Sequence, residues 1–140
     1  MPSPTERTLK ALKEQKYDLI GIVERRVPNP ALKWGSQTVD LFGFLDILCC
    51  DVKTKTILGV QSTGQDYAGH MRKMTEDCRD NLAAFLGAGG EVQLWAWRKI
   101  KHVKKDGKKG KGYRWKPRIA YFSLADDKIL VQEEKRSFLA

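Results

Sequence analysis

The sequence has 140 residues and a formal net charge of +9, and its length predicts a single domain with one hydrophobic core. No apolar run approaches the length of a membrane span, and the N-terminal residues lack the apolar stretch of a signal peptide, so we expect no membrane segment. Three cysteines, Cys49, Cys50 and Cys78, form neither a disulfide framework nor a zinc-ligand spacing. These features favour a reduced, cytoplasmic protein.

The positive charge is concentrated in one segment of the chain. Between Arg98 and Arg118 there are eleven lysines and arginines and one acidic residue, whereas the rest of the chain holds 15 basic and 16 acidic residues. Seven lysines and three glycines fall within residues 99–112. Such a segment cannot be buried, and its like charges repel one another. We therefore expect a flexible basic arm at residues 99–112 on a nearly neutral body, with a merely solubilising loop as the alternative.

The first part of the chain predicts a helix, a strand and a loop. Ser3 or Thr5 can cap a helix that ends near Tyr17. The isoleucine- and valine-rich segment Asp18–Arg26 predicts a first strand. Residues 27–38 hold two prolines and a glycine, which predict a loop.

The middle of the chain predicts a hairpin followed by a helix. Two apolar runs, Leu41–Cys50 and Thr56–Thr63, are joined by a short polar segment, which is typical of a buried hairpin. Asp66 is a credible N-cap for the next element. Apolar residues then recur with the helical period from Tyr67 to about Leu86.

The last part of the chain predicts two strands, Glu91–Arg98 and Tyr113–Leu124, and Pro117 suggests an edge position for the second. A short apolar run, Ile129–Val131, is either another strand or a tail that packs against the body. The order of elements is therefore α-β-β-β-α-β-β. It predicts an α/β or α+β sandwich, in which helices flank a mixed central sheet.

Three polar side chains interrupt the apolar hairpin. Asp46 lies within the first run, and Gln61 and Thr63 end the second run, two residues apart and hence on one face of a strand. A carboxylate in apolar surroundings is costly unless a cation meets it. This cost favours a metal ligand at Asp46. The alternatives are a solvated position at a strand edge and a pair with an arginine.

The layout of these residues resembles the PD-(D/E)XK nuclease superfamily, with Asp46 in one central strand and Gln61-Ser62-Thr63 at the end of the next. Within it, the small Holliday-junction-resolvase-like members look most similar. DLFGFLDIL, GVQSTG, a helical Arg72-Lys73 pair and a WAWRK strand are similar to a family of small phage and bacterial proteins. The resemblance covers roughly residues 5–120 and implies a restriction-endonuclease-like fold.

The resemblance also implies a magnesium site. In that superfamily the strand aspartate and the acidic residue of the (D/E)xK tripeptide hold Mg²⁺, and the lysine assists the attacking water. Asp46 matches the strand aspartate, Gln61 the second acidic position, Thr63 the lysine position and Glu24 an upstream carboxylate. Mg²⁺, or Mn²⁺, would thus be held by Asp46, Gln61 and Glu24, since these ions prefer oxygen ligands. Asp40 is either a further ligand or a turn residue, and we favour the turn.

Two positions depart from the family's residues, because Gln61 is neutral and Thr63 has no ammonium group. A lysine from the following helix can stand in among relatives, which makes Lys73, or Arg72 beside it, the candidate cation. Each residue also has a structural interpretation. Gln61 can hydrogen-bond buried backbone, Thr63 is a good strand former, Glu24 can form a surface salt bridge, and the Arg72-Lys73 pair can be a solvated helix face.

These expectations combine into a metal-dependent DNA endonuclease that acts on branched or junction DNA. The basic arm would contact phosphates, with an affinity that falls as salt rises. The expected DNA contacts are Arg72, Lys101, Lys104, Lys105, Lys108, Lys109, Lys111 and Arg114. The resemblance further implies a homodimer and a bacterial or phage-infected cell. A non-catalytic DNA-binding module on the same fold, and a protein-interaction domain whose arm binds an acidic partner, are the alternatives.

Overall fold

The computed structural model describes residues 2–33, 35–103 and 107–133, and all structural statements concern these residues. The strands are β1 (Leu19–Ile22), β2 (Arg25–Pro28), β3 (Ser36–Val39), β4 (Ile47–Asp51), β5 (Thr56–Thr63), β6 (Glu91–Val103), β7 (Lys109–Ala125) and β8 (Lys128–Glu133). The helices are α1 (Pro4–Glu14), α2 (Tyr67–Arg72), the π-helical turn η1 (Lys73–Asp77) and α3 (Arg79–Gly87). None of these helices is long and apolar enough to cross a membrane.

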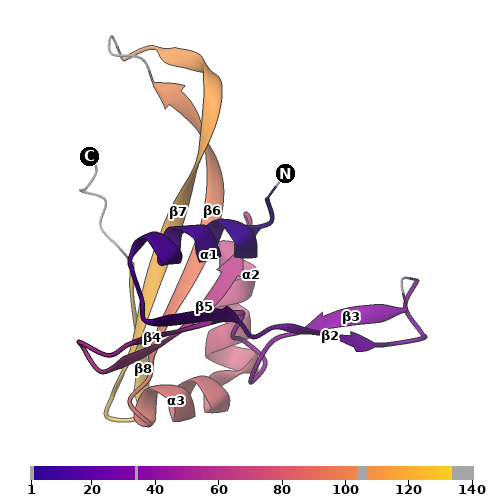
Figure 1. Cartoon of the computed structure of the whole chain (residues 1–140), viewed down its shortest axis with the longest axis vertical. Coiled ribbons are helices and arrows are strands. Elements are labelled where there is room, and N and C mark those ends of the chain that lie inside the picture. Colours follow the sequence, from indigo (N-terminus) through magenta and orange to yellow (C-terminus); the bar gives the residue numbers. More distant parts are fainter. Residues whose placement is uncertain (1, 34, 104–106, 134–140) are drawn as a thin grey trace.

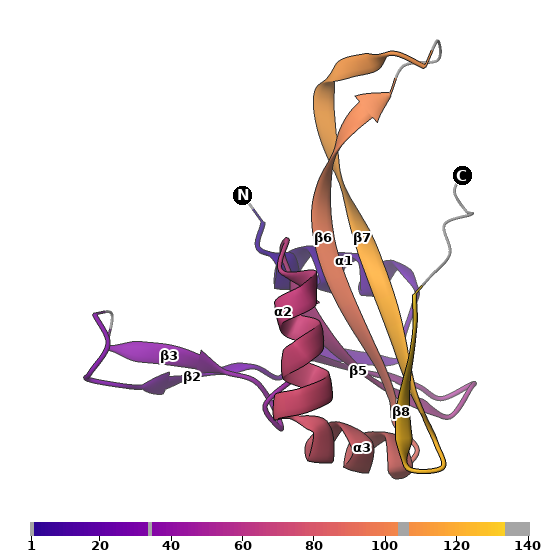
Figure 2. The ribbon, with the colours of Figure 1, turned by 180° about the vertical axis from the view of Figure 1, so that it is seen from behind.

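Six strands form one mixed sheet in the order β1-β4-β5-β6-β7-β8. Every neighbouring pair is antiparallel except β5 and β6, which are parallel and are joined across the sheet by α2, η1 and α3. Figures 1 and 2 show α1 on one face of this sheet and α2 and α3 on the other. The protein is thus an α+β fold around a mostly antiparallel sheet.

Alternation along the strands sends apolar side chains into two cores. The core under α1 contains Leu12 and Trp97, and the core under α2 and α3 contains Met74 and Leu94. Gln61 and Leu94 are paired across the parallel strands, so Gln61 lies on the α2 face. The site described below therefore lies on this face of the sheet.

The predicted first helix is present and is capped by Ser3, whose Oγ accepts a hydrogen bond from the N–H of Glu6 at 3.1 Å. It ends at Glu14, before the expected Tyr17, because the backbone turns at Lys16, which has a φ of 61°. The prediction of Asp66 as the next N-cap is confirmed. Its carboxylate accepts a hydrogen bond from the N–H of Gly69 at 3.0 Å.

The prediction of one strand over Asp18–Arg26 and a loop over residues 27–38 is wrong. The chain leaves the sheet after Ile22, where the carbonyl of Asp46 accepts a hydrogen bond from the N–H of Val23 at 2.8 Å. It then forms β2 and β3, which pair only with each other as a separate two-stranded sheet. Prolines predict a loop well, but they are compatible with a strand that has no neighbour on one side.

The first run of the central hairpin is also shorter than expected. Phe42 and Gly43 have φ values of 57° and 86°, so the chain makes a tight turn before Asp46. Strand β4 begins only at Ile47, which places Asp46 at the start of the strand and not within it. The second run is confirmed as β5 over the predicted residues.

The expected helix from Tyr67 to Leu86 is present but interrupted. The α-helical pattern gives way to a π-helical turn at Lys73 and then breaks at Cys78, whose φ and ψ are −108° and 21°. After this break the chain axis turns, so α3 runs across the end of α2 (Figure 2). π-helical turns are rare, and they are frequent at functional sites.

The expected flexible arm is instead a two-stranded ribbon in its described part. β6 and β7 extend beyond the sheet as far as Val103 and from Lys109, respectively (Figure 1). The Nζ atoms of Lys99 and Lys101 lie 4.6 and 5.9 Å from the ring centroid of Tyr113, and a cation over an aromatic ring is favourable. Cross-strand pairing therefore overrides the local glycine and lysine composition.

The strand predictions near the C-terminus are confirmed. Pro117 pairs with Trp97 of β6, but β8 pairs with β7 only from Ala120 onward. At Pro117 the outer side of β7 is thus an edge, where the missing N–H costs no ladder hydrogen bond. The run Ile129–Val131 is part of β8.

Candidate metal centre

Asp46 is buried at the start of β4, with 2% of its surface exposed. Its backbone N–H donates to the carbonyl of Val60 at 2.8 Å, which fixes the residue against β5. Among the described residues, its carboxylate is bonded by an amide and a backbone N–H, and no guanidinium is paired with it. The two structural alternatives for Asp46, solvent exposure and an arginine pair, are therefore wrong for this part of the chain.

Gln61 and Ser62 hold the Asp46 carboxylate from β5. The Nε2 of Gln61 donates to Oδ2 of Asp46 at 2.5 Å, and the N–H of Ser62 donates to the same oxygen at 2.7 Å. The Oε1 of Gln61 is buried and has no hydrogen-bond partner among the residues that the structure describes. An unpaired buried carbonyl costs about 1–3 kcal/mol, and rotating the amide by half a turn would aim this oxygen at the carboxylates. That orientation is favourable when a cation, or the proton of a neutral carboxyl group, lies between them.

Glu24, Asp40 and Asp46 form a cluster in which one carboxylate oxygen of each lies within 4.8 Å of the others. Two oxygens that share one Mg²⁺ at about 2.1 Å lie up to about 4.2 Å apart, so small side-chain rotations suffice to bring all three to one ion. The acidic cluster thus fits a magnesium ion, and rotated Gln61 would supply a neutral fourth oxygen.

Asp40 acts both in the turn and in the acidic cluster. Its carbonyl accepts a hydrogen bond from the N–H of Gly43 at 3.1 Å, as the turn interpretation requires. Its carboxylate nevertheless faces the cluster, where Nε2 of Gln61 lies 3.4 Å from Oδ2. The preferred interpretation of Asp40 as a turn residue is confirmed, and its role as a metal ligand stays a prediction.

Lys73 reaches the acidic cluster from the π-helical turn. Its Nζ lies 2.8 Å from Oδ2 of Asp40, in an ion pair whose lysine side chain is 34% exposed. This places the expected lysine at the cluster, one residue after α2 ends. Arg72 is exposed, and the bonds described at the cluster do not include it, so the two neighbours have different environments.

The carboxyl groups have unequal proton affinities. Burial, the hydrogen bond to Asp40 and the nearby charges of Asp40 and Glu24 raise the pKa of Asp46 from 3.8 to about 8. Burial also acts to raise the pKa of Asp40, but hydrogen bonds to Asp46 and Lys73 outweigh it and lower that pKa. At neutral pH the pair therefore keeps one proton. A divalent cation would replace this proton.

The end of β5 is held on its opposite face by a buried hydroxyl network. The Oγ atoms of Ser62 and Thr8 are 2.7 Å apart, and Nε1 of Trp97 donates to the Thr8 hydroxyl at 2.7 Å. This network joins β5, α1 and β6 directly behind Gln61. Thr63 is buried on the same face as Gln61 and lies opposite Ala96 of β6, as its structural interpretation predicts.

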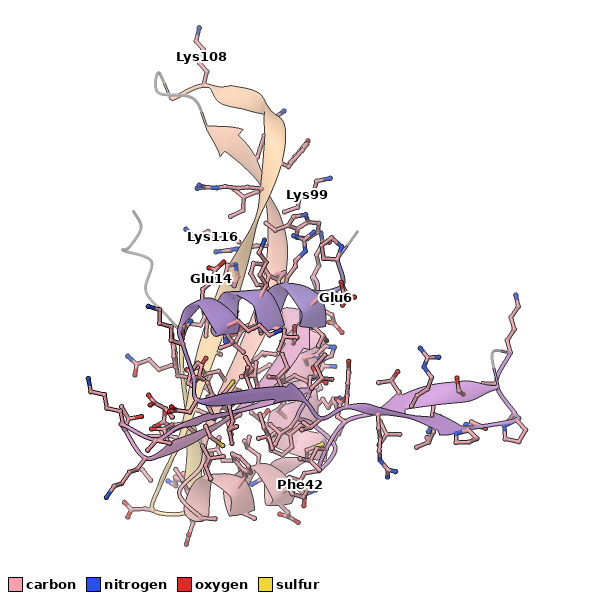
Figure 3. All side chains as sticks on the ribbon, in the orientation of Figure 1. Glu6, Glu14, Phe42, Lys99, Lys108 and Lys116 are labelled. Atoms are coloured by element: carbon pink, nitrogen blue, oxygen red, sulfur yellow. The ribbon has the colours of Figure 1, made fainter. Side chains whose placement is uncertain are left out.

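The expected DNA contacts are spread over both faces of the ribbon. Lys101 pairs with Tyr113, whereas Arg114 pairs with Ile100, so Lys101 and Arg114 point to opposite faces. Lys108 extends from the far end (Figure 3). Lys104 and Lys105 lie outside the described residues, as do the side chains of Lys109 and Lys111.

Sequence reasoning missed the cations on the same face as Gln61. These are Arg98, Lys116 and Arg118. Arg118 pairs with Ala96, which is also the partner of Thr63, and Lys116 pairs with Arg98 two residues further along β6. Strand alternation could have identified these cations. Arg98 is an even number of residues from Leu94 in β6, and Lys116 and Arg118 are an even number from Ala120 in β7, so all three share the face of those core residues. The Arg118 guanidinium stacks 3.6 Å from the ring centroid of Tyr67 and is hydrogen-bonded to Glu133.

A hollow of about 310 Å³ lies where β5 ends and α2 begins. It is lined by Gly64, Gln65, Tyr67, Ala96, Trp97, Arg98, Lys99 and Arg118. Gly64, which lines this hollow, follows Gln61 by three residues along the chain. Comparisons with protein-family models, curated proteins and solved structures find no match for this chain.

Proposed function

We propose that the protein is a metal-dependent nuclease that hydrolyses phosphodiester bonds in DNA. The observation that carries this proposal is the burial of Asp46 beside Asp40 and Glu24, with the unpartnered Oε1 of Gln61 at the same place. A buried carboxylate beside two further acids is repelled by them and is costly without a cation. A divalent ion among the three acids would offset both costs.

Asp46, Asp40 and Glu24 would hold Mg²⁺ or Mn²⁺, and Gln61 would add its amide oxygen. When bound, the cation would activate a water molecule and stabilise the charge that develops on the attacked phosphate. With Asp46 ionised, the three acids carry three negative charges against one positive charge on Lys73. The remaining charge of −2 matches a divalent ion.

Lys73 would act on the attacking water or on the pentacovalent phosphate. Its ammonium group lies on Asp40, at the edge of the acidic cluster, and is partly open to solvent. When the metal binds, the Lys73 ammonium group would be released from Asp40 or shared with it. It would then be well placed to contact a phosphate oxygen. This is the role that the (D/E)xK lysine has in the family that the sequence resembles.

The DNA would lie over the α2 face, from the acidic cluster to the ribbon. Arg98, Arg114, Lys116 and Arg118 extend the face that carries Gln61, and the hollow beside Tyr67 is large enough for part of a nucleotide. The neighbouring phosphates of one strand would then meet cations while the cleaved phosphate meets the metal.

A restriction-endonuclease-like fold is part of this proposal. The expected order α-β-β-β-α-β-β corresponds to α1, β1, β4, β5, the helical crossover, β6 and β7. The β2–β3 hairpin is then an insertion between the first two strands of the core. A homodimer, implied by the resemblance to resolvases, is proposed with it.

A DNA-binding module without cleavage is the second candidate, and one observation favours it. Gln61 and Ser62 already bond Asp46, and Lys73 already pairs with Asp40, so one proton completes the cluster without a metal. Thr63 also lacks the ammonium group expected at its position.

Incubation of plasmid and four-way-junction DNA with the protein in Mg²⁺ or Mn²⁺ separates the two candidates. Cleavage by the wild type that is lost in Asp46→Asn supports the nuclease. Asp80→Asn, an exposed acid on α3, is the matched control and should cleave normally. DNA binding without cleavage in wild type and both variants would instead support the binding module.

A further inference from the structure

The β2–β3 hairpin connects two members of the acidic cluster. Glu24 immediately precedes Arg25 of β2, Asp40 immediately follows Val39 of β3, and Arg25 and Val39 are the first pair of the hairpin. Any movement of the hairpin at its base therefore passes directly to two carboxylates. Asp46, the third member, lies just before β4, and its carbonyl accepts hydrogen bonds from the N–H groups of Val23 and Glu24 at 2.8 and 3.4 Å. The base of the hairpin is therefore tied to Asp46 by backbone hydrogen bonds.

The hairpin projects from the body as a thin two-stranded arm (Figures 1 and 3). Isolated two-stranded hairpins are marginally stable in water, so a partner on the hairpin would stabilise it. Its own hydrogen bonds include Arg26 to Oγ of Ser36 at 3.0 Å and Asn29 to Oε1 of Gln37 at 2.9 Å. Both hydrogen bonds are exposed to solvent.

The charge of the hairpin indicates what this partner is. Residues 25–39 include Arg25, Arg26 and Lys33 and contain no acidic residue, although the body as a whole is nearly neutral. Arg25 and Arg26 are exposed and, being consecutive in a strand, point to opposite faces. This pattern fits a polyanion that contacts the arm along its length, and DNA is the polyanion that the ribbon also fits.

The hairpin and the β6–β7 ribbon leave the body in different directions, with α2 between their bases (Figures 1 and 2). DNA that contacted both arms would cross the α2 face, where Lys73 joins the acidic cluster. Along this path, the acidic cluster lies at the base of the hairpin, and the cations of β6 and β7 lie on the ribbon.

We propose that the β2–β3 hairpin is a second DNA-contacting arm, and that DNA bound to it increases the affinity of the acidic cluster for a divalent cation. The inference rests on the proposed function. DNA would order the hairpin base and hence hold Glu24 and Asp40 in position to bind the ion. By linkage, the cation would increase DNA affinity by the same factor.

The test measures Mn²⁺ binding by electron paramagnetic resonance, with and without a saturating short DNA duplex that is kept cold and checked for intactness. The variants are Arg25→Ala/Arg26→Ala in the hairpin and Lys99→Ala/Lys101→Ala in the ribbon, a matched loss of two exposed cations. Asp46→Asn with the same duplex measures the Mn²⁺ that the DNA itself attracts.

We expect DNA to raise the Mn²⁺ affinity of the wild type about fivefold or more, a typical size for coupling between two sites. The ribbon variant should keep this increase once DNA saturates it, whereas the hairpin variant should lose it. The hairpin variant should also lower the slope of log affinity for DNA against log salt by about 2.

DNA could raise the Mn²⁺ affinity equally in the wild type, the hairpin variant and the ribbon variant, or the hairpin variant could keep the DNA affinity and salt slope of the wild type. Either result would overturn the inference and leave the nuclease proposal intact. A wild type that binds no more Mn²⁺ than Asp46→Asn, with and without DNA, would instead refute the metal site itself. Those two failures are therefore distinguishable in one experiment.

Discussion

The acidic cluster and the basic ribbon are both charged, but the protein holds them in opposite ways. Asp46 of the cluster is buried, its carboxylate is held by Gln61 and Ser62, its neighbour Asp40 pairs with Lys73, and the pKa of Asp46 is raised to about 8. The ribbon is exposed, and its cations rest on aromatic side chains such as Tyr113. Burial turns a charge into a chemical group with an altered proton affinity, whereas exposure leaves a charge that attracts ions at a distance.

The comparison predicts that the largest effect on activity comes from the cluster. Asp46→Asn keeps the shape of the side chain but removes the charge that a cation needs. We expect cleavage of junction or plasmid DNA to fall by about 10³-fold or more in a gel assay, with DNA binding almost unchanged when both proteins are compared without metal. Cleavage by this variant at the wild-type rate would remove Asp46 from the chemistry.

Lys73→Ala should have the next largest effect and should separate metal binding from turnover. Its removal leaves Asp40 without a cation, so the cluster should bind Mg²⁺ at least as tightly as in the wild type. Turnover should nevertheless fall by about 10²-fold, because the cation beside the attacked phosphate is lost.

Lys73→Arg keeps the positive charge and should recover part of the activity. Isothermal titration with Mg²⁺, combined with single-turnover cleavage, measures both quantities. If Lys73→Ala and wild type cleave at equal rates, the ion pair with Asp40 is purely structural.

The raised pKa of Asp46 predicts an unusual dependence of stability on pH. Because this pKa is higher in the folded than in the unfolded chain, the stabilisation is complete below about pH 4 and is lost as the pH rises to about 8. We expect the metal-free protein to lose on the order of 5 kcal/mol of unfolding free energy over this range, measured by urea denaturation at each pH.

Asp40 works in the opposite direction, since its lowered pKa contributes stability that is lost only as the pH falls into the acid range. Asp46→Asn should flatten the profile between pH 4 and 8, and saturating Mg²⁺ should do the same in the wild type. A wild-type profile that is already flat without metal would show that Asp46 titrates as an ordinary carboxyl.

The smallest predicted effect concerns the ribbon. Arg98→Ala/Arg114→Ala removes two exposed cations from the face that carries Gln61. We expect DNA affinity to fall about tenfold and the slope of log affinity against log salt to decrease by about 2, measured by fluorescence anisotropy. The rate of cleavage at saturating DNA should change little. An unaltered salt slope would mean that DNA does not follow this face.

Local patterns predicted those elements whose residues carry their own signal. Ser3 and Asp66 marked helix starts, β5 was delimited by its apolar run, and Pro117 marked a strand edge. Asp46 and Gln61 stood out because polar residues are rare in such runs. In each case the physical cause lies within a few residues of the signal.

The remainder depended on partners that are distant in the sequence. The role of Asp40 depends on Lys73, 33 residues away, and the position of Lys73 depends on a π-helical turn that no residue pattern marks. The ribbon forms because β6 and β7 pair along their whole described length, and the β2–β3 hairpin forms at a place where prolines suggest a loop. Long-range pairing decides these features, and local composition does not report it.

A crystal structure with Mn²⁺ would show whether the acidic cluster binds a divalent cation. We expect an anomalous peak between Glu24, Asp40 and Asp46, with Oε1 of Gln61 turned toward the ion. The same crystals without such a peak, and with Nε2 of Gln61 still bonded to Asp46, would refute the metal site.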